Sequence, residues 1–567
     1  MICTSHRRLN NFVTELLAAR PDEHRRKTVY EFDNPRHGWV FFRTAADVRA
    51  GASAELRLES GSRTTLLTRH GPSGTSTSEA MRQLPEGKHK LRLALKGESS
   101  ISSLVVRGIP EILYANYPSN PHLKEYGTYD WDYLARIGML ANVNTIITGS
   151  FGDWAGDWVK RGGKVVQQVG VPGLRKEEAV TAQSAYDYWS RTEGMTHPGM
   201  SGVIADEFYP AEGKMAPLAT AIMRLARAKK RRSFYPYIGG EPLRLRPFVE
   251  PLLKETSCCF ANERYLKEQP TEEMAERFLE RELKRDLEGY KAYAPDFQRR
   301  LILVLGLLCG PPESLNTRPG VSYKVYMDMQ FHLIATDPAF RDIYGIEEYL
   351  SSYSDEEYLR WAAKLYRHYC IEGKRNRLSN DPYILNHLEN PDFEEGLKGW
   401  TVSAAEPGSI DVKSMEGLGW LQGRYTREGE GDRFLWMRRS ATKPNVVSQT
   451  VRNLEPGRAY SLKLYIADYL ELTKNQMHGV RVEIEGVDLV AWKCFHAVYP
   501  NCYSHHIPRF GDQNTYFNFI RLVFHPRKAS AELSISDWAS GGQPGGPIGQ
   551  ELMYNFVEVE PYLMDSD

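Results

Sequence analysis

The sequence lacks several features that would assign a function directly. It has seven cysteines in 567 residues, an odd and sparse number that gives no disulfide framework. Two of them, Cys258 and Cys259, lie in an apolar run and are expected to be buried thiols. There is no Gly-x-Ser-x-Gly elbow, no glycine-rich phosphate loop and no His-Glu-x-x-His motif. The chemistries that depend on those motifs are therefore not indicated, and no cofactor is expected.

The chain also lacks an excess of charge of either sign and lacks long apolar runs. Its 72 Lys and Arg residues balance 72 Asp and Glu residues, so nothing points to nucleic acid or to an anionic membrane surface as a partner. No stretch reaches the ~18 to 20 apolar residues that a membrane span needs. The basic start, residues 1–8, is not followed by an apolar segment. We therefore expect a cytoplasmic protein or a precursor whose true N-terminus is missing.

The length predicts about three domains, and the texture of the sequence changes at their expected boundaries. Residues 1–26 read as a polar helix or tail. Short alternating strands between glycine, serine and proline turns predict a small β-sandwich over 27–109. Strand and helix patterns alternate over 110–375, a polar linker follows over 376–388, and β texture returns over 389–567.

The central segment has the pattern of a (β/α)₈ barrel. Eight apolar runs alternate with helical patterns in about 260 residues, which is the usual size of that fold. The runs are Ile112–Tyr117, Thr145–Thr148, Val165–Val169, Val203–Ala205, Phe234–Ile238, Cys258–Ala261, Leu301–Leu308 and Ile343–Gly345. An open doubly wound sheet is the alternative, but the glycine-rich loop that often follows an early strand of that fold is missing.

The most informative segment is residues 202–210, where an apolar run ends in Asp206 and Glu207. In barrels, catalytic groups sit at the carboxyl ends of the strands. Paired carboxylates suit acid/base chemistry, and the aromatic residues that follow suit stacking on sugar rings. The alternative is that one of the two acids caps the next helix.

The next three strand ends also present carboxylates, namely Glu241, Glu263 and Glu313. Glycoside hydrolysis needs two carboxyl groups, one holding a proton and one ionised. We expect Glu207 to be the general acid/base, Glu263 the nucleophile or base, and Asp206 an orienting partner. The alternative for Glu263 is a salt bridge with Arg264 or another basic neighbour. Glu241 and Glu313 are expected to bind sugar hydroxyls, unless they belong to plain turns.

Aromatic and amide side chains near the strand ends are candidates for binding a sugar. Each could instead belong to the hydrophobic core, as most aromatic residues do. These candidate substrate-binding residues are Asn116, Trp154, Tyr209, Tyr237 and Tyr265.

The C-terminal segment carries three motifs of a known module type. It opens Asn390-Pro391-Asp392-Phe393-Glu394-Glu395-Gly396-Leu397-Lys398-Gly399-Trp400, has a central Leu454-Glu455-Pro456-Gly457 turn before a strand, and ends Asn555-Phe556-Val557-Glu558-Val559-Glu560. These motifs resemble the galactose-binding-like jelly rolls that accompany glycoside hydrolases. The resemblance implies that Phe393 and Trp400 anchor a core, and that the module either binds sugar or has a structural role.

The same resemblance implies a structural calcium near the first and last strands, with Asn390 and Glu394 as candidate ligands. The closing strand lacks the Asp-Asp pair that such modules usually show, which weakens that expectation. A cluster of Cys494, His496, Cys502, His505 and His506 contains residue types that bind zinc, but its spacing matches no compact zinc motif. We expect no metal there.

The whole layout resembles a multidomain glycoside hydrolase, and the consecutive Asp206-Glu207 pair resembles that of retaining hexosaminidases that use the substrate's acetamido group. We therefore expect an enzyme that cleaves glycosidic bonds in an oligo- or polysaccharide. The alternative is a non-catalytic carbohydrate-binding protein with a degenerate barrel. A polysaccharide lyase is disfavoured, because no histidine lies at the strand ends.

Overall fold

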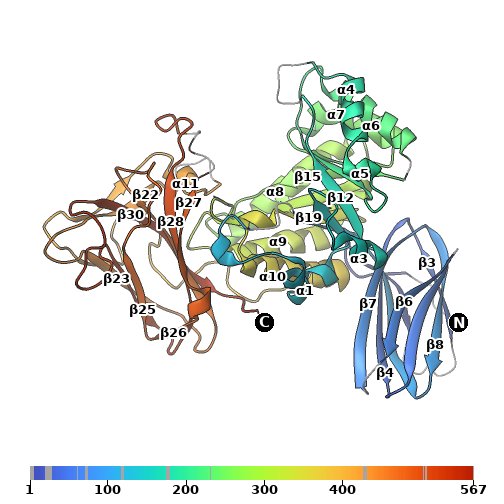
Figure 1. Ribbon diagram of the computed structural model, residues 1–567, viewed down its shortest axis with the longest axis horizontal. Coiled ribbons are helices and arrows are strands. Elements are labelled where there is room, and N and C mark those ends of the chain that lie inside the picture. The colour runs from blue at the N-terminus through green and yellow to red at the C-terminus, as the bar shows by residue number, and fades with distance from the viewer. Residues whose placement is uncertain are drawn as a thin grey trace.

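The computed structural model describes residues 6–19, 28–60, 62–70, 74–116, 121–173, 179–229, 231–425, 431–501, 504 and 507–565. Figure 1 shows three parts in chain order: a β-sandwich in blue, a barrel with its helices in teal to yellow, and a second β-sandwich in orange to red. This architecture confirms the fold class predicted from the sequence. Among the described residues, no helix is both long and apolar enough to cross a membrane.

The N-terminal β-sandwich consists of two antiparallel sheets, with strand orders β1-β2-β9-β4-β7 and β3-β8-β5-β6. Buried and exposed residues alternate along β8, as expected of a strand with one face on a core. The strands are β1 (Arg7–Arg8), β2 (Thr14–Ala19), β3 (Val29–Asn34), β4 (Gly38–Val48), β5 (Ser53–Ser60), β6 (Ser62–His70), β7 (Gly74–Leu84), β8 (Gly87–Lys96) and β9 (Ser99–Ile109).

Strand β2 corrects the expectation that residues 1–26 form a helix or tail. It pairs antiparallel with β9, and its Leu16 is buried in the sandwich core. The pairing joins segments about 90 residues apart, which local periodicity does not reveal. Just before β2, the Asn10 side chain donates hydrogen bonds to the Tyr369 and Lys374 carbonyls. The N-terminal segment therefore ties the sandwich to the barrel.

The central domain is a closed barrel of eight parallel strands in the order β10-β11-β12-β13-β14-β15-β16-β19. Pairing of β10 with β19 closes it and excludes the open-sheet alternative. The strands are β10 (Glu111–Ala115), β11 (Thr145–Thr148), β12 (Lys164–Val169), β13 (Gly202–Phe208), β14 (Ser233–Ile238), β15 (Phe260–Arg264), β16 (Leu301–Gly306) and β19 (Gly345–Tyr349), with a small hairpin of β17 (Cys309–Gly310) and β18 (Glu313–Ser314) after β16.

Helices follow most of the strands and cover the barrel from outside (Figure 1). Several begin at capping side chains; Thr271 before α8 and Asp355 before α10 each accept a hydrogen bond from a backbone N–H of the first turn. The helices are α1 (Trp131–Arg136), α2 (Met139–Asn142), α3 (Ala155–Lys160), α4 (Ala182–Ser190), α5 (Glu193–Thr196), α6 (Met215–Ala228), α7 (Pro242–Glu255), α8 (Glu272–Lys291), α9 (Tyr323–Thr336) and α10 (Glu356–Leu365), which continues as a π-helix over Tyr366–Ile371.

The C-terminal domain is a β-sandwich of a four-stranded sheet, β20-β23-β29-β25, and a larger sheet, β21-β22-β30-β24-β28-β26, with β27 also paired to β28. The Phe393 and Trp400 rings stack in its core, with centroids 5.1 Å apart. The elements are β20 (Thr401–Ser403), β21 (Ile410–Ser414), α11 (Leu418–Leu421), β22 (Arg433–Arg438), β23 (Val446–Val451), β24 (Tyr460–Asp468), β25 (Arg481–Glu485), β26 (Val487–Leu489), β27 (Phe495–Pro500), β28 (Tyr516–Pro526), β29 (Ala531–Ser536) and β30 (Glu551–Pro561).

Buried ion pairs join the larger sheet of the C-terminal domain to the barrel. Lys324 of α9 lies 2.7 Å from both Glu357 of α10 and Glu560 of β30. Arg521 of β28 lies 3.0 Å from Glu356 of α10. A buried charge that loses its partner is costly, so this interface holds the two domains together as one unit.

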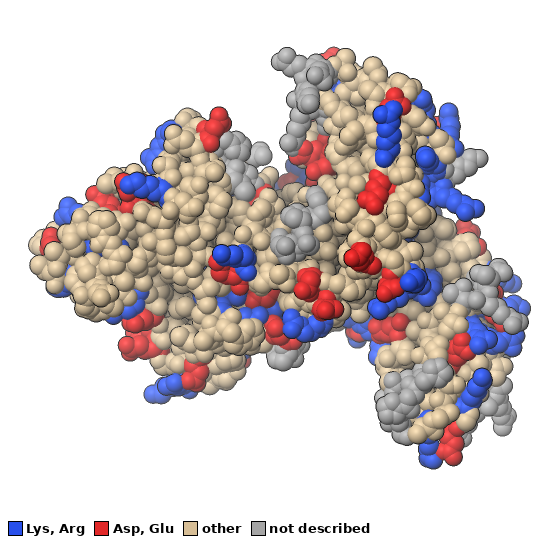
Figure 2. All heavy atoms as spheres, viewed as in Figure 1, with Lys and Arg blue, Asp and Glu red and all other residues tan. Residues whose placement is uncertain are grey.

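Figure 2 shows a hollow between the C-terminal domain and the part of the barrel domain that carries α4, α6 and α7. On the face shown, Lys and Arg side chains are interspersed with Asp and Glu side chains over all three domains.

We predict that Lys324→Met lowers the free energy of unfolding by about 3 to 5 kcal/mol, because it removes the cation that lies against the buried Glu357 and one of the two against Glu560. Lys398→Met is the matched control. Lys398 pairs with Glu395 at the surface, and its loss should cost about 1 kcal/mol or less. Urea unfolding followed by tryptophan fluorescence measures both. Equal, small effects would mean that the buried pairs do not join the domains.

Candidate active site

Two tyrosines of β14 show which side chains point into the barrel. The Tyr235 hydroxyl donates to Glu111 at the start of β10, and the Tyr237 hydroxyl donates to Glu347 of β19. Because side chains alternate along a strand, residues in register with these tyrosines also point inward. Ile204 is opposite Tyr235 and therefore points inward. The regular register ends after Ala205, and Asp206 is placed beside the inward acids by its electrostatic effect on Glu263 and Glu347.

Three carboxylates converge at the carboxyl ends of the strands. Glu263 of β15 is in register with Val304 of β16, and Val304 is in register with Glu347 of β19, so both acids share the inward face. The negative charge of Asp206 acts on the pKa of both. The structure therefore brings together the predicted residues Asp206 and Glu263 and adds Glu347.

Tyrosine hydroxyls hold these carboxylates in place. The Glu263 carboxylate accepts from the Tyr265 hydroxyl at 2.9 Å and from the Tyr209 hydroxyl at 3.3 Å. Glu347 accepts from the Tyr237 hydroxyl at 2.7 Å. All three predicted tyrosines thus contact a carboxylate. The alternative of an Arg264 salt bridge for Glu263 is wrong, because Arg264 is bound to Asp286 and Glu282 of α8.

Burial makes two of these acids hold a proton near neutral pH. It raises the pKa of Glu263 to about 7, with Asp206 adding to the rise while the bonds from Tyr265 and Tyr209 oppose it. Burial likewise raises the pKa of Glu347 to about 8; the bond from Tyr237 opposes the rise, and Glu263 and Asp206 add to it. Crowded, desolvated carboxyls of this kind are typical of acid/base sites.

At the opposite end of the same barrel, the buried acid Glu111 has a cation and hydrogen bonds that offset the cost of its burial. Burial would raise the pKa of Glu111, but Lys164 and hydrogen bonds from Thr145 and Tyr344 outweigh it and lower that pKa. Lys164 lies 3.3 Å from the Glu111 carboxylate. Glu111 therefore belongs to a satisfied structural ion pair, whereas no cation contributes to the raised pKa of Glu263 or of Glu347.

Glu207 occupies an irregular backbone position next to the acids. The pairing of β13 with β14 shifts register between Ala205 and Phe208, and Glu207 has φ of +66°, which is uncommon for a residue other than glycine. Such bulges and strained residues occur next to active sites and re-aim side chains. The helix-cap alternative is wrong, because α6 starts only at Met215, after Lys214.

The other predicted residues have different surroundings. Glu241 is exposed and immediately precedes α7 without capping it through its side chain. Glu313 lies on the β17–β18 hairpin. Trp154 stacks on Trp131 of α1 with ring centroids 4.6 Å apart. Asn116 follows β10, and its backbone N–H donates to Ile147.

Sequence reasoning missed Glu347 and the contribution of the C-terminal domain. The eighth strand was expected to end at Gly345, but it continues to Tyr349. The signal was present, because Glu347 and Glu348 directly follow the apolar Ile346. The backbone of Tyr425 in the C-terminal domain donates to Ser314 of the β17–β18 hairpin.

Tyr425 also lies close enough to Tyr209 to affect its pKa, which burial and Glu263 raise most strongly. The site therefore lies where the barrel faces the C-terminal domain, and the hollow in Figure 2 separates the same two parts.

Several buried acceptor atoms near the carboxyl ends of the strands lack a hydrogen-bond donor among the described residues. They are Oε2 of Glu347, Oε1 of Gln168 and Oδ1 of Asn116. Gln168 is in register with Ile204 and so points inward. Buried acceptors normally find a donor, and a ligand rich in hydroxyl groups supplies such donors.

The candidate metal ligands have other partners. The Asn390 amide donates to the carbonyls of Gly396 and Lys398, and its oxygen accepts from Glu395. Glu394 accepts from the Gly431 N–H. The calcium expectation stays a prediction. Cys494 contacts backbone carbonyls, and His496 contacts Asn518.

The other members of that cluster, Cys502, His505 and His506, lie outside the described residues. Within the described part of the chain, no group of three or more His, Cys, Asp or Glu residues is placed to hold a metal. Cys258 and Cys259 are buried free thiols, as expected.

No protein-family model matches the chain, and no curated protein sequence matches it. Several solved structures resemble it. A cycloisomaltooligosaccharide glucanotransferase of Paenibacillus sp. matches at 8% identity and a TM-score of 0.33, over 94% of this chain and 72% of that chain. A GH2 β-galacturonidase of Eisenbergiella tayi matches at 9% identity and a TM-score of 0.31, over 63% and 70%. A ruminal GH26 endo-β-1,4-mannanase matches at 9% identity and a TM-score of 0.24, over 68% and 92%. Likeness at this level carries no functional argument, so the function is argued from the site.

We predict that Glu263 destabilises the folded protein at alkaline pH. Its pKa is about 7 when folded, against an ordinary 4.5, so the folded state binds the proton more tightly. The free energy of unfolding should then fall by about 3 kcal/mol as pH rises from the ordinary value through the folded one. Glu263→Gln should remove this loss, matching the wild type near pH 5 and exceeding its stability near pH 8.

Thermal unfolding at the two pH values measures the effect, with the exposed Glu241→Gln as control. A Glu263→Gln protein whose stability follows the wild type at both pH values would contradict the raised pKa.

Proposed function

We propose that the chain is a glycoside hydrolase that cleaves an oligo- or polysaccharide by carboxylate acid/base catalysis at the carboxyl ends of the barrel strands. The observation that carries the proposal is the convergence of Asp206, Glu263 and Glu347, with Glu263 poised to hold a proton near neutral pH. Glycosidic cleavage needs one such proton donor beside one ionised carboxylate.

Glu263 is the best candidate for the general acid. A pKa of about 7 leaves much of it protonated at neutral pH, and donating that proton to the glycosidic oxygen lets the bond to the anomeric carbon break. The carboxylate of Asp206 then faces the positive charge that develops on the sugar ring. Water forms the new bond to the anomeric carbon, and a carboxylate of the site takes up the proton that this water releases. This assignment gives Glu263 the role of acid that was expected for Glu207 from the sequence, which predicted Glu263 to be the nucleophile or base. The acid role of Glu207 stays a prediction.

Glu347 suits a binding role better than a proton-transfer role. With a pKa of about 8 it is mostly neutral when Glu263 titrates, so it adds little negative charge beside Asp206. One of its oxygens is held by Tyr237, and the other has no hydrogen-bond donor among the described residues. A sugar hydroxyl can both donate to and accept from a neutral carboxyl.

Aromatic rings support a carbohydrate substrate. Tyr265 and Tyr349 stack with their centroids 5.8 Å apart, and Tyr209 is 45% exposed beside Glu263. A Cβ at Gly239 would lie 2.4 Å from the Tyr209 ring, so glycine there lets the ring lie across the end of β14. Exposed rings beside acids are suited to packing against the flat face of a pyranose.

We predict that Glu263→Gln lowers turnover of an unactivated oligosaccharide by about 10² to 10⁴-fold, because it removes the transferable proton. An aryl glycoside with a good leaving group should lose much less. Asp206→Asn should impair both substrates. Glu207→Gln, tested in the same way, decides between the two candidate acids. Glu241→Gln, at an exposed position, is the control. Steady-state kinetics on both substrates measures the effects.

If Glu207→Gln shows the leaving-group dependence and Glu263→Gln does not, then Glu207 is the acid. If the parent protein binds oligosaccharides but cleaves none, the non-catalytic binding protein is the better description.

We further predict that kcat/KM falls as pH rises through about 7, because Glu263 then loses its proton. The hydroxyl of Tyr265 stabilises the ionised carboxylate, so Tyr265→Phe should raise the pKa of Glu263 and move this limb to higher pH. Tyr188→Phe, at an exposed position of α4, is the control. If the fall of kcat/KM occurs at the same pH in Tyr265→Phe as in the parent protein, then a group other than Glu263 controls it.

A further inference from the structure

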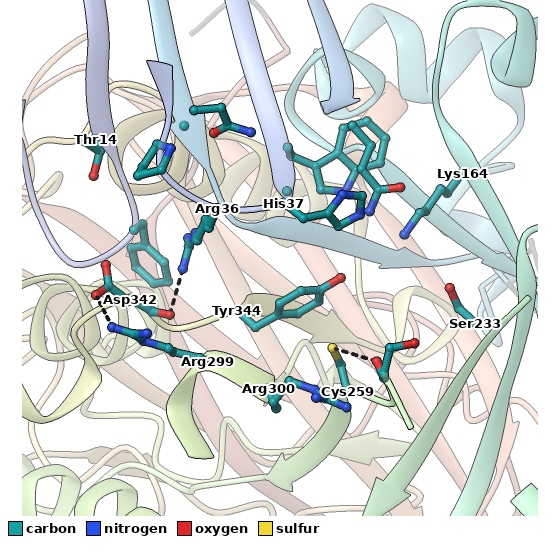
Figure 3. A pocket seen from close by; sticks show the side chains of 18 of the residues that line it. Thr14, Arg36, His37, Lys164, Ser233, Cys259, Arg299, Arg300, Asp342 and Tyr344 are labelled. Atoms are coloured by element: carbon teal, nitrogen blue, oxygen red, sulfur yellow. Dashed lines mark hydrogen bonds and ion pairs between the residues drawn. The ribbon is translucent and has the colours of Figure 1, made fainter. Parts of the chain in front are cut away.

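A cavity lies at the end of the barrel opposite the three carboxylates, between its N-terminal face and the N-terminal β-sandwich. Its volume is about 950 Å³. Figure 3 shows side chains of both domains pointing into it, among them Arg36 and His37 from the sandwich and Lys164, Arg299 and Arg300 from the barrel.

The charges that line this cavity are strongly one-sided. Among the described residues that line it, seven are Lys or Arg and Asp342 is the single acidic one. The chain as a whole has equal numbers of the two signs, so this enrichment is local. Arg8 and Arg36 come from the sandwich, whereas the other five come from the barrel.

Lys164 is paired with Glu111, but Asp342 cannot balance the six lining arginines. Arg8 lies 2.8 Å and Arg299 3.8 Å from its carboxylate. Arg36 donates to the Asp342 backbone carbonyl at 3.0 Å, and Figure 3 shows Arg36 and Arg299 meeting at this residue. Burial lowers the pKa of Arg36, and Arg8 and Arg299 lower it further despite Asp342. Guanidinium groups do not lose their charge in proteins, so the repulsion remains.

Two further barrel cations are held at the rim by backbone carbonyls. Arg300 donates to the carbonyls of Cys258 and Thr256, and Arg232 donates to that of His197. These bonds fix the guanidinium positions without neutralising their charge. Hydroxyl groups of Ser201, Ser233 and Ser257, at the starts of successive barrel strands, line the same space.

We propose that this cavity binds a small molecule bearing more than one oxyanion group, of the phosphate or carboxylate class. Fixed guanidinium groups and hydroxyl donors recognise such oxygens through charge-assisted hydrogen bonds. A multiply charged ligand would contact arginines of both domains and relieve their mutual repulsion. The site is independent of the proposed glycosidase site, because it lies at the other end of the barrel.

Titration calorimetry with pyrophosphate tests the proposal, and citrate in a second arm separates phosphate from carboxylate preference at equal ionic strength. Both arms use the full chain. We expect saturable binding with one site. Arg8→Gln combined with Arg299→Gln should weaken it at least about tenfold, because it removes two cations of the cavity. Arg49→Gln combined with Arg527→Gln, two exposed arginines of other surfaces, is the matched control.

Asp342→Asn keeps the proposal testable if the double variant folds poorly. Asp342 has φ of +63°, a conformation that asparagine tolerates, and losing the single lining carboxylate should tighten binding several-fold. Absence of saturable binding to either anion would overturn the proposal. Equal weakening in the two double variants, or weaker binding in Asp342→Asn, would overturn it as well.

Discussion

Closure of the eight-stranded barrel is the constraint on which the rest of the structure depends. A closed barrel fixes the register of every strand, so alternate residues must point inward. On β14 this rule places Tyr235 against Glu111 at one end and Tyr237 against Glu347 at the other. Two polar layers result. The first is compensated by Lys164 and serves stability. The second keeps acids of raised pKa and acceptor atoms that have no donor among the described residues. That asymmetry is the reason for proposing the chemistry at the carboxyl ends.

The C-terminal domain is part of this arrangement and not an appended module. Its larger sheet carries the buried Lys463 and Glu560, which are paired 2.6 Å apart, and Glu560 in turn meets Lys324 of the barrel. Gly423 approaches the barrel so closely that a Cβ there would lie 1.9 Å from the Pro312 carbonyl. Deleting the domain would therefore expose buried charges as well as remove one side of the proposed site, and loss of activity in a truncated chain would not show that the domain binds sugar.

The sequence predicted the architecture because its signals are local. Apolar runs followed by acids mark strand ends, and this located Asp206 and Glu263 and the tyrosines beside them. What it did not reveal depends on pairing between distant segments. Strand β2 is defined by β9, and the length of β19 by β10 and β16, so Glu347 was assigned to no strand. The bulge at Glu207 depends on its register with β14. The role of each acid was harder still to predict from the sequence, because burial sets the pKa of Glu263 and burial is a property of the fold.

A neutral net charge hides a separation of charge within one domain. Acids gather at the carboxyl ends of the barrel strands, where their mutual repulsion and burial keep protons on Glu263 and Glu347. Cations gather around the opposite end, where, beside the paired Lys164, six arginines line the cavity and Asp342 is the one acidic residue among the described lining residues. Each cluster is unfavourable for folding when considered by itself. Proteins retain such unfavourable clusters of like charge where the crowded groups bind a ligand. The two clusters here carry opposite charge. The acid end suits a neutral substrate that needs a proton, and the basic end suits an anion.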